Sequence, residues 1–77
     1  MDVRELVARS LDNPALLARV GDEEDLLAVG VNSGELIRIA LSCEDVLGRA
    51  LTDDELTAVH SLDGVRRLLG EGGHHVA

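Results

Sequence analysis

Ser33 is the residue whose type and position offer the most chemistry. It follows the turn-prone run Gly30-Val31-Asn32, and Asn32 forms a capping-box pair with Glu35, so a helix is expected to begin with Ser33 at its first position. A phosphate ester on this exposed hydroxyl would lie among free backbone N–H groups, where the helix dipole favours an anion by about 0.3–1 kcal/mol. Position alone also fits a plain small polar residue at a helix start.

Other patterns that would indicate catalysis are weaker. The Gly-x-Ser-x-Gly elbow of a serine hydrolase would require glycine at Val31 and Glu35, and it belongs in a much larger domain. His60 is the only histidine outside the C-terminal tail, and its setting is typical of a solvated helix residue rather than a general base. We therefore expect no enzyme activity and no catalytic residue; a minimal hydrolase using Ser33 and His60 would need turnover by the purified chain alone.

No strong metal or thiol site is expected either. His74 and His75 lie in a Gly-rich tail that offers no fixed geometry for a metal. The acidic run at residues 22–25 lacks the alternating oxygen ligands and glycine of a calcium loop. Cys43 has no partner for an internal disulfide and falls on an apolar helix face, where a thiol is inert.

Composition excludes several classes of function. A chain of 77 residues has room for one small domain, and a core without aromatic residues must be built from aliphatic side chains, which suits helices. The net charge of −8 repels nucleic acid and anionic membranes, and the aromatic platforms of single-strand binders are missing. With no apolar run long enough to cross a bilayer and no leader pattern, a cytoplasmic protein is expected.

The elements that must position Ser33 are predicted to be helices. Residues 3–11 have helical apolar spacing, Asn13-Pro14 interrupts it, and residues 16–20 are expected to form a short second piece. The remaining expected elements are a helix from Ser33 to Leu47 ended by Gly48, a short helix capped by Thr52 and reaching about His60, a last helix capped by Ser61 and ended by Gly70, and a flexible tail over residues 71–77. The domain is thus predicted to span residues 1–70.

The helix that begins at Ser33 has two apolar surfaces. Its predicted core face consists of Ile39, Ala40, Cys43 and Leu47. Ile37 and Leu41 then lie on another side, beside Arg38 and Asp45, and are expected to stand partly exposed. Scattered apolar surface residues are common, but this patch rimmed with acid also suits a surface for partner proteins.

The segment over residues 25–33 resembles the acyl carrier family's pattern of an acid, several apolar residues, Gly, an apolar residue, Asp and a modified Ser. Three later segments are similar to the end of the family's second helix and the starts of its third and fourth: residues 44–48, 52–55 and 61–65. The resemblance covers about residues 3–69.

This resemblance implies a four-helix fold and a covalent cofactor. A phosphopantetheinyl transferase would move 4'-phosphopantetheine from coenzyme A to Ser33, and acyl or aminoacyl groups would then be held as thioesters on the arm. The family's usual Asp before the modified Ser is Asn32 here, and its usual Leu or Met is Gly34. Asn still caps a helix but removes a charge that the transferase reads, and Gly removes an apolar contact near the arm.

The sequence therefore predicts an all-α carrier protein with three longer helices and a short third one. The expected partners are the transferase and the ligase, acyltransferase or synthase enzymes that load or unload the arm. The residues expected to contact them are Asn32, Gly34, Ile37, Arg38, Leu41 and Asp45.

Because the chain departs from the Asp-Ser-Leu pattern and has arginine but no lysine, a discrete monomeric carrier in polyketide or nonribosomal peptide biosynthesis is favoured over general fatty acid synthesis. The alternative is a small helical interaction module that is never modified.

Overall fold

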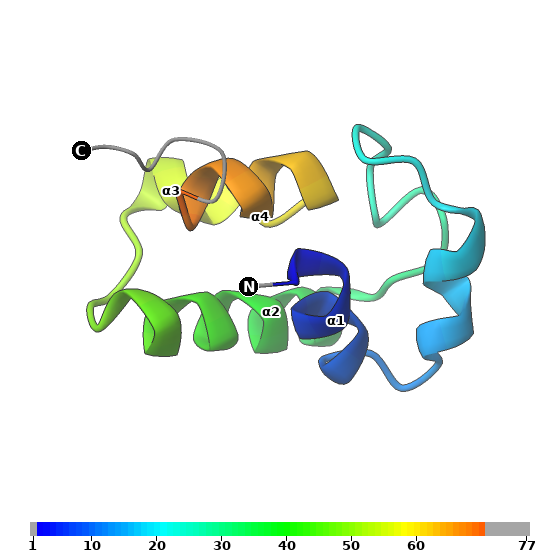
Figure 1. Ribbon diagram of the computed structural model, residues 1–77, viewed down its shortest axis with the longest axis horizontal. Coiled ribbons are helices and arrows are strands. Elements are labelled where there is room, and N and C mark those ends of the chain that lie inside the picture. Colours follow the sequence, from blue (N-terminus) through cyan, green and yellow to red (C-terminus); the bar gives the residue numbers. More distant parts are fainter. Residues whose placement is uncertain (1, 71–77) are drawn as a thin grey trace.

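The computed structural model describes residues 2–70, and these residues are helical with no strand. The predicted all-α class is confirmed. The elements in chain order are the α-helix α1 (Val3–Arg9), the 3-10 helix η1 (Pro14–Arg19), and the α-helices α2 (Ser33–Leu47), α3 (Asp53–Ala58) and α4 (Leu62–Leu68). Figure 1 shows α2 along one side of the molecule, α3 and α4 on the other, and η1 at the end where α2 begins.

The helix lengths differ from the prediction of three longer helices and one short one. Only α2 is long, with 15 residues, whereas α1, α3 and α4 have six or seven. The first helix was expected to reach Leu11 but ends at Arg9. There the Ser10 N–H donates to the Val7 carbonyl at 2.9 Å and the Ser10 hydroxyl donates to the Leu6 carbonyl at 3.4 Å, so the helix tightens and stops.

The short second piece predicted at residues 16–20 is the 3-10 helix η1. Pro14 occupies its first position, where the missing N–H of proline leaves no donor unsatisfied. Leu17 and Val20 are buried in the core. These two side chains therefore anchor the connector between α1 and α2 to the rest of the domain.

The ends of α2, α3 and α4 follow the predicted capping chemistry. The Thr52 hydroxyl accepts a hydrogen bond from the Glu55 N–H at 3.2 Å, and the Glu55 carboxylate accepts one from the Thr52 N–H at 3.0 Å. The Ser61 hydroxyl accepts from the Gly64 N–H at 3.0 Å. At the end of α2, Gly48 adopts the left-handed conformation with φ 74° that a helix terminus of this kind requires.

Gly64 allows α4 to pack closely on the end of α3. A Cβ atom built at this position would overlap the carbonyl group of Ala58. Because no flexible side chain is involved that could move aside, the contact between α3 and α4 requires glycine here.

The core is entirely aliphatic apart from one thiol. Fifteen buried apolar residues form one cluster, drawn from all parts of the domain: Val3, Leu6, Val7, Leu11, Leu17, Val20, Leu26, Val31, Leu36, Ile39, Ala40, Cys43, Val59, Leu62 and Val65. Of the predicted core face of α2, Ile39, Ala40 and Cys43 are buried, but Leu47 is only half-buried and Leu36 takes the fourth place. Leu47 is the last residue of α2.

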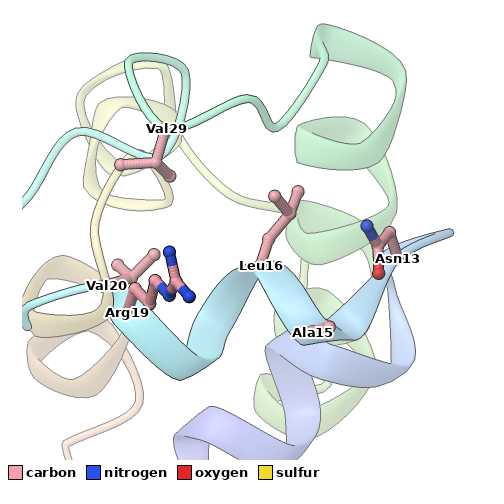
Figure 2. Close-up of a pocket in the computed structure, with 6 residues that line it drawn as sticks. All are labelled: Asn13, Ala15, Leu16, Arg19, Val20 and Val29. Carbon is pink, nitrogen blue, oxygen red and sulfur yellow. The ribbon is translucent and has the colours of Figure 1, made fainter.

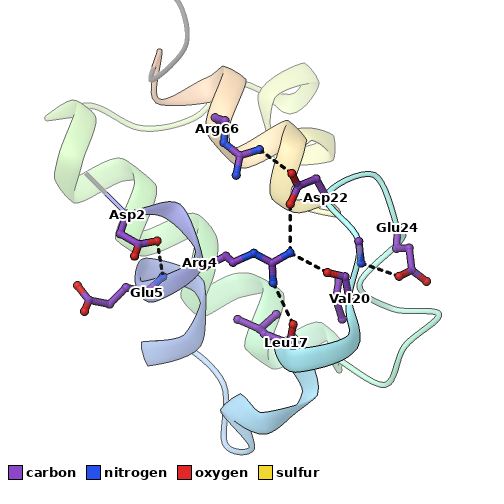
Figure 3. Close-up of polar contacts among 9 residues, drawn as sticks. Asp2, Arg4, Glu5, Leu17, Val20, Asp22, Glu24 and Arg66 are labelled. Carbon is purple, nitrogen blue, oxygen red and sulfur yellow. Dashed lines mark hydrogen bonds and ion pairs between the residues drawn. The ribbon is translucent and has the colours of Figure 1, made fainter.

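The connector between α1 and α2 is fixed by Arg4 (Figure 3). The Arg4 guanidinium donates to the carbonyls of Leu17 at 2.9 Å and Val20 at 2.8 Å and pairs with the Asp22 carboxylate at 3.2 Å. The other oxygen of Asp22 lies 3.5 Å from the Arg66 guanidinium of α4. One charged network thus ties the connector to α1 and α4.

Within residues 2–70, no helix has the length and apolar character needed to cross a membrane.

Candidate functional site

Ser33 is exposed and is the first residue of α2, as the sequence predicts. The Asn32 side-chain oxygen accepts from the Glu35 N–H at 2.8 Å, and one Glu35 carboxylate oxygen accepts from the Asn32 N–H at 3.0 Å. Neither the Ser33 nor the Gly34 N–H donates to any residue between 2 and 70. The hydroxyl of Ser33 therefore stands beside two free donors at the positive end of a 15-residue helix.

The turn before Ser33 is held on the core. Gly30 has a φ of 112°, a backbone conformation that other residues rarely adopt. The next residue, Val31, is buried, and its N–H donates to the Leu26 carbonyl at 3.0 Å. Leu26 in turn donates its N–H to the His60 carbonyl at 2.8 Å, just beyond α3. The position of Ser33 is thus set by the packing of this turn on α3.

Glu35 does more than the capping role that the sequence predicts for it. Its second carboxylate oxygen accepts from the Asp12 N–H at 2.7 Å, so one buried side chain links the start of α2 to the turn that follows α1. Glu35 is only 4 % exposed. A buried carboxylate needs such partners because each unmade hydrogen bond would be a large penalty. The sequence signals the capping box but not this second bond.

A groove with apolar walls begins at Ser33 and runs between α2 and α3. It has a volume of about 270 Å³ and is lined by Ser33, Leu36, Ile37, Ala40, Leu56, Val59 and His60. The wall from α3 was not anticipated from the sequence. Ser33 and His60 therefore line the same groove, but no hydrogen bond joins their side chains within the described part of the chain, so a nucleophile and base pair is not assembled.

The predicted exposure of Ile37 and Leu41 on α2 is confirmed, with 61 % and 55 % of their surface accessible. Asp45 is exposed one turn beyond Leu41. Arg38, the cation predicted on this surface, pairs with the Asp12 carboxylate at 2.9 Å, and this hydrogen bond and ion pair raise the pKa of Arg38. Much of its charge is therefore balanced by a residue of the same chain.

The other predicted partner residues lie at the start of α2. Asn32 and Gly34 are both exposed beside Ser33. A Cβ atom at Gly34 would lie 3.3 Å from the capping oxygen of Asn32, so the absence of a side chain leaves the cap uncrowded. The structure thus places the predicted residues along one exposed surface from Asn32 to Asp45.

Cys43 is buried, and this burial raises the pKa of its thiol above the ordinary value, with the nearby Glu44 carboxylate adding to the effect. A thiol in this state is a weak nucleophile. Within residues 2–70, no three His, Cys, Asp or Glu side chains are grouped as metal ligands would be. His74 and His75 lie outside the described residues.

Comparison with known families identifies one match. The model of the family described as the phosphopantetheine attachment site matches residues 2–69, nearly the whole described chain. Searches of the curated proteins and of the solved structures find no match.

Proposed function

Since the chain belongs to the phosphopantetheine attachment site family, we propose that Ser33 is the residue that bears the 4'-phosphopantetheine arm. Domains of this family are not enzymes; they are sites of covalent attachment of this arm and carry acyl groups on it. The observation that supports Ser33 is its position: it is an exposed hydroxyl at the first turn of α2, beside the free N–H groups of Ser33 and Gly34.

These residues fit a phosphodiester. In the attachment step, the Ser33 oxygen would form a bond to the phosphorus of coenzyme A that bears pantetheine, the pyrophosphate bond would break, and the nucleotide would leave. The serine proton would pass to a base of the transferase, because the described residues place no base in hydrogen-bond contact with Ser33. The two free N–H groups and the positive end of the helix dipole would then stabilise the anionic ester.

The groove beside Ser33 fits the apolar part of the arm and its cargo. Its lining residues are aliphatic except for Ser33 and His60. The terminal thiol of the arm would form the thioester with the acyl cargo. The residues that line the groove would shield part of the bound group from water. On this proposal the helices α1 to α4 form the four-helix bundle of a carrier domain spanning residues 1–70, with η1 as an added turn in the connector.

The exposed surface of α2 is proposed as the contact with partner enzymes. Ile37 and Leu41 supply apolar contacts, and Asp45 supplies an acid that complements a basic partner surface. Asn32, Gly34 and Arg38 complete this surface. The partners are the phosphopantetheinyl transferase and the enzymes that load the arm with an acyl or aminoacyl group or remove it.

The proposed biosynthetic pathway rests on the positions at which this chain departs from the family's usual Asp-Ser-Leu pattern. Asn32 and Gly34 in place of the usual Asp and Leu, together with an arginine-only set of cations, favour a discrete carrier of polyketide or nonribosomal peptide intermediates. A monomeric, cytoplasmic protein is part of this proposal. The mass of the protein isolated from its own host would identify the cargo.

The test is the intact mass of the wild-type chain after incubation with coenzyme A and a broad-specificity phosphopantetheinyl transferase. A carrier gains the mass of one arm. An unmodified interaction module, the alternative function, keeps its original mass under conditions in which a known carrier protein is fully converted.

A further inference from the structure

A second pocket lies between η1 and the turn that leads into α2. It has a volume of about 390 Å³ and is lined by Asn13, Ala15, Leu16, Arg19, Val20 and Val29. Figure 2 shows Leu16 between the two polar side chains, with Asn13 on one side and Arg19, next to Val20 and below Val29, on the other. The pocket thus combines an aliphatic floor with a cationic group at one end and an amide at the other.

Both polar side chains of this pocket lack a partner in the part of the chain that the structure describes. Five of the seven arginines form ion pairs with carboxylates: Arg4, Arg38, Arg49, Arg66 and Arg67. Arg19 pairs with none between residues 2 and 70, although the chain carries fifteen acids. The Asn13 side chain, at the position that would cap η1, makes no capping hydrogen bond there.

The chemistry of the lining selects the ligand class. Arginine presents two parallel N–H donors that match one carboxylate, and the lining holds no second cation to balance a doubly charged phosphate. Leu16, Val20 and Val29 favour an aliphatic stem. We propose that this Arg19 pocket binds the carboxylate end of a short aliphatic acyl group.

The arm of the same chain is the most direct source of such a group, and this part of the inference rests on the function proposed for Ser33. Val29 precedes Ser33 by four residues, so their Cα atoms are separated by at most about 15 Å. The main chain of the phosphopantetheine arm has about fourteen bonds, and its extended length equals that of roughly four to five residues. The arm is therefore long enough to span the distance from Ser33 to Val29.

Tethering makes a weak site effective. Arg19 is exposed, so a single ion pair there binds a free carboxylate only weakly. A ligand on a short flexible tether has an effective concentration of about a millimolar, so it occupies the pocket when the ion pair and the contacts with Leu16, Val20 and Val29 together give a Kd of about a millimolar or lower. A dicarboxylic acyl group on the arm is thus held at Arg19, whereas a neutral acyl group of the same length is left to the groove between α2 and α3.

The test compares two acyl groups of five carbons by NMR. The ¹⁵N-labelled chain is loaded by the transferase from glutaryl- or valeryl-coenzyme A, and backbone amide shifts are recorded for residues 15–20 and for Val29. We expect the glutaryl group to shift these amides relative to the valeryl group in the wild type and in Arg9→Gln. Arg9 is the matched control, because it is also exposed and also lacks an ion pair within residues 2–70. In Arg19→Gln the difference should disappear.

A titration of the unloaded chain with free glutarate distinguishes the two sources of carboxylate. A saturable response of the same amides, lost in Arg19→Gln, supports the pocket even when loading fails, whereas failed loading itself overturns the proposed function. The inference is overturned when neither tethered nor free glutarate shifts these amides, or when Arg19→Gln responds as the wild type does. It is also overturned when Arg19→Gln only slows the transferase, which would assign Arg19 to a protein interface.

Discussion

Leu41→Ala separates the surface role of α2 from its role in the core. Leu41 is 55 % exposed, and full burial of a leucine side chain contributes about 1.5–3 kcal/mol, so the covered part contributes about 1 kcal/mol. No cavity forms at an exposed position, and alanine has the higher helix propensity. We therefore expect the free energy of unfolding to fall by about 1 kcal/mol or less, which lowers the Tm by about 4–8 °C at most.

Leu62→Ala is the buried control for this prediction. Leu62 in α4 has no accessible surface, and such a truncation costs about 2–5 kcal/mol because it removes buried contacts and leaves a cavity. Urea unfolding followed by circular dichroism at 222 nm distinguishes the two variants clearly.

Loading by the transferase should show the opposite order. An apolar anchor at an interface is worth about 1–2 kcal/mol, so kcat/KM for Leu41→Ala should fall about 5- to 30-fold, while folded Leu62→Ala loads close to normally. The proposed partner surface is refuted when Leu41→Ala unfolds as easily as Leu62→Ala yet loads at the wild-type rate once folded.

Three further changes test separate parts of the structure. Glu55→Gln tests stability in acid. Hydrogen bonds from Arg49 and from a backbone N–H lower the pKa of Glu55 from 4.5 to about 2. The stability that this carboxylate contributes is therefore present above pH 4.5 and is lost as the pH falls toward 2. Urea unfolding should therefore show a smaller loss of stability between pH 5 and pH 2 in Glu55→Gln than in the wild type, and equal losses would contradict the assigned cause. Gly64→Ala should lower the free energy of unfolding by at least about 1–3 kcal/mol, measured by thermal unfolding, because the added Cβ meets the Ala58 carbonyl; an unchanged Tm would contradict the close packing of α3 on α4. Asp45→Arg should leave unfolding nearly unchanged while slowing association with the transferase and reducing its salt dependence, and an unchanged rate at low salt would exclude Asp45 from the interface.

Local features of this chain could be predicted because they depend on hydrogen bonds between residues close in sequence. The capping boxes of Asn32 with Glu35 and Thr52 with Glu55, and the terminal Gly48, all require only a short segment. The Asn32–Glu35 capping box places Ser33 at the start of α2, which is why the sequence alone could locate the candidate site.

Features that depend on packing between distant segments could not be predicted. The second hydrogen bond of Glu35 reaches Asp12, and its existence depends on where the connector lies. Leu36 and Leu47 are about three turns apart and share the core side of α2, so which of them is fully buried depends on where the other helices pack along α2. The same holds for the wall that α3 contributes to the groove beside Ser33.

The central claim is tested most directly by the intact mass of Ser33→Ala after reaction with coenzyme A and a phosphopantetheinyl transferase that converts the wild type. Loss of one hydroxyl at an exposed helix start should leave the helical circular dichroism spectrum nearly unchanged, and we expect no gain in mass. A Ser33→Ala protein that still gains one arm, at Ser10, Ser42 or Ser61, would contradict the assignment of Ser33.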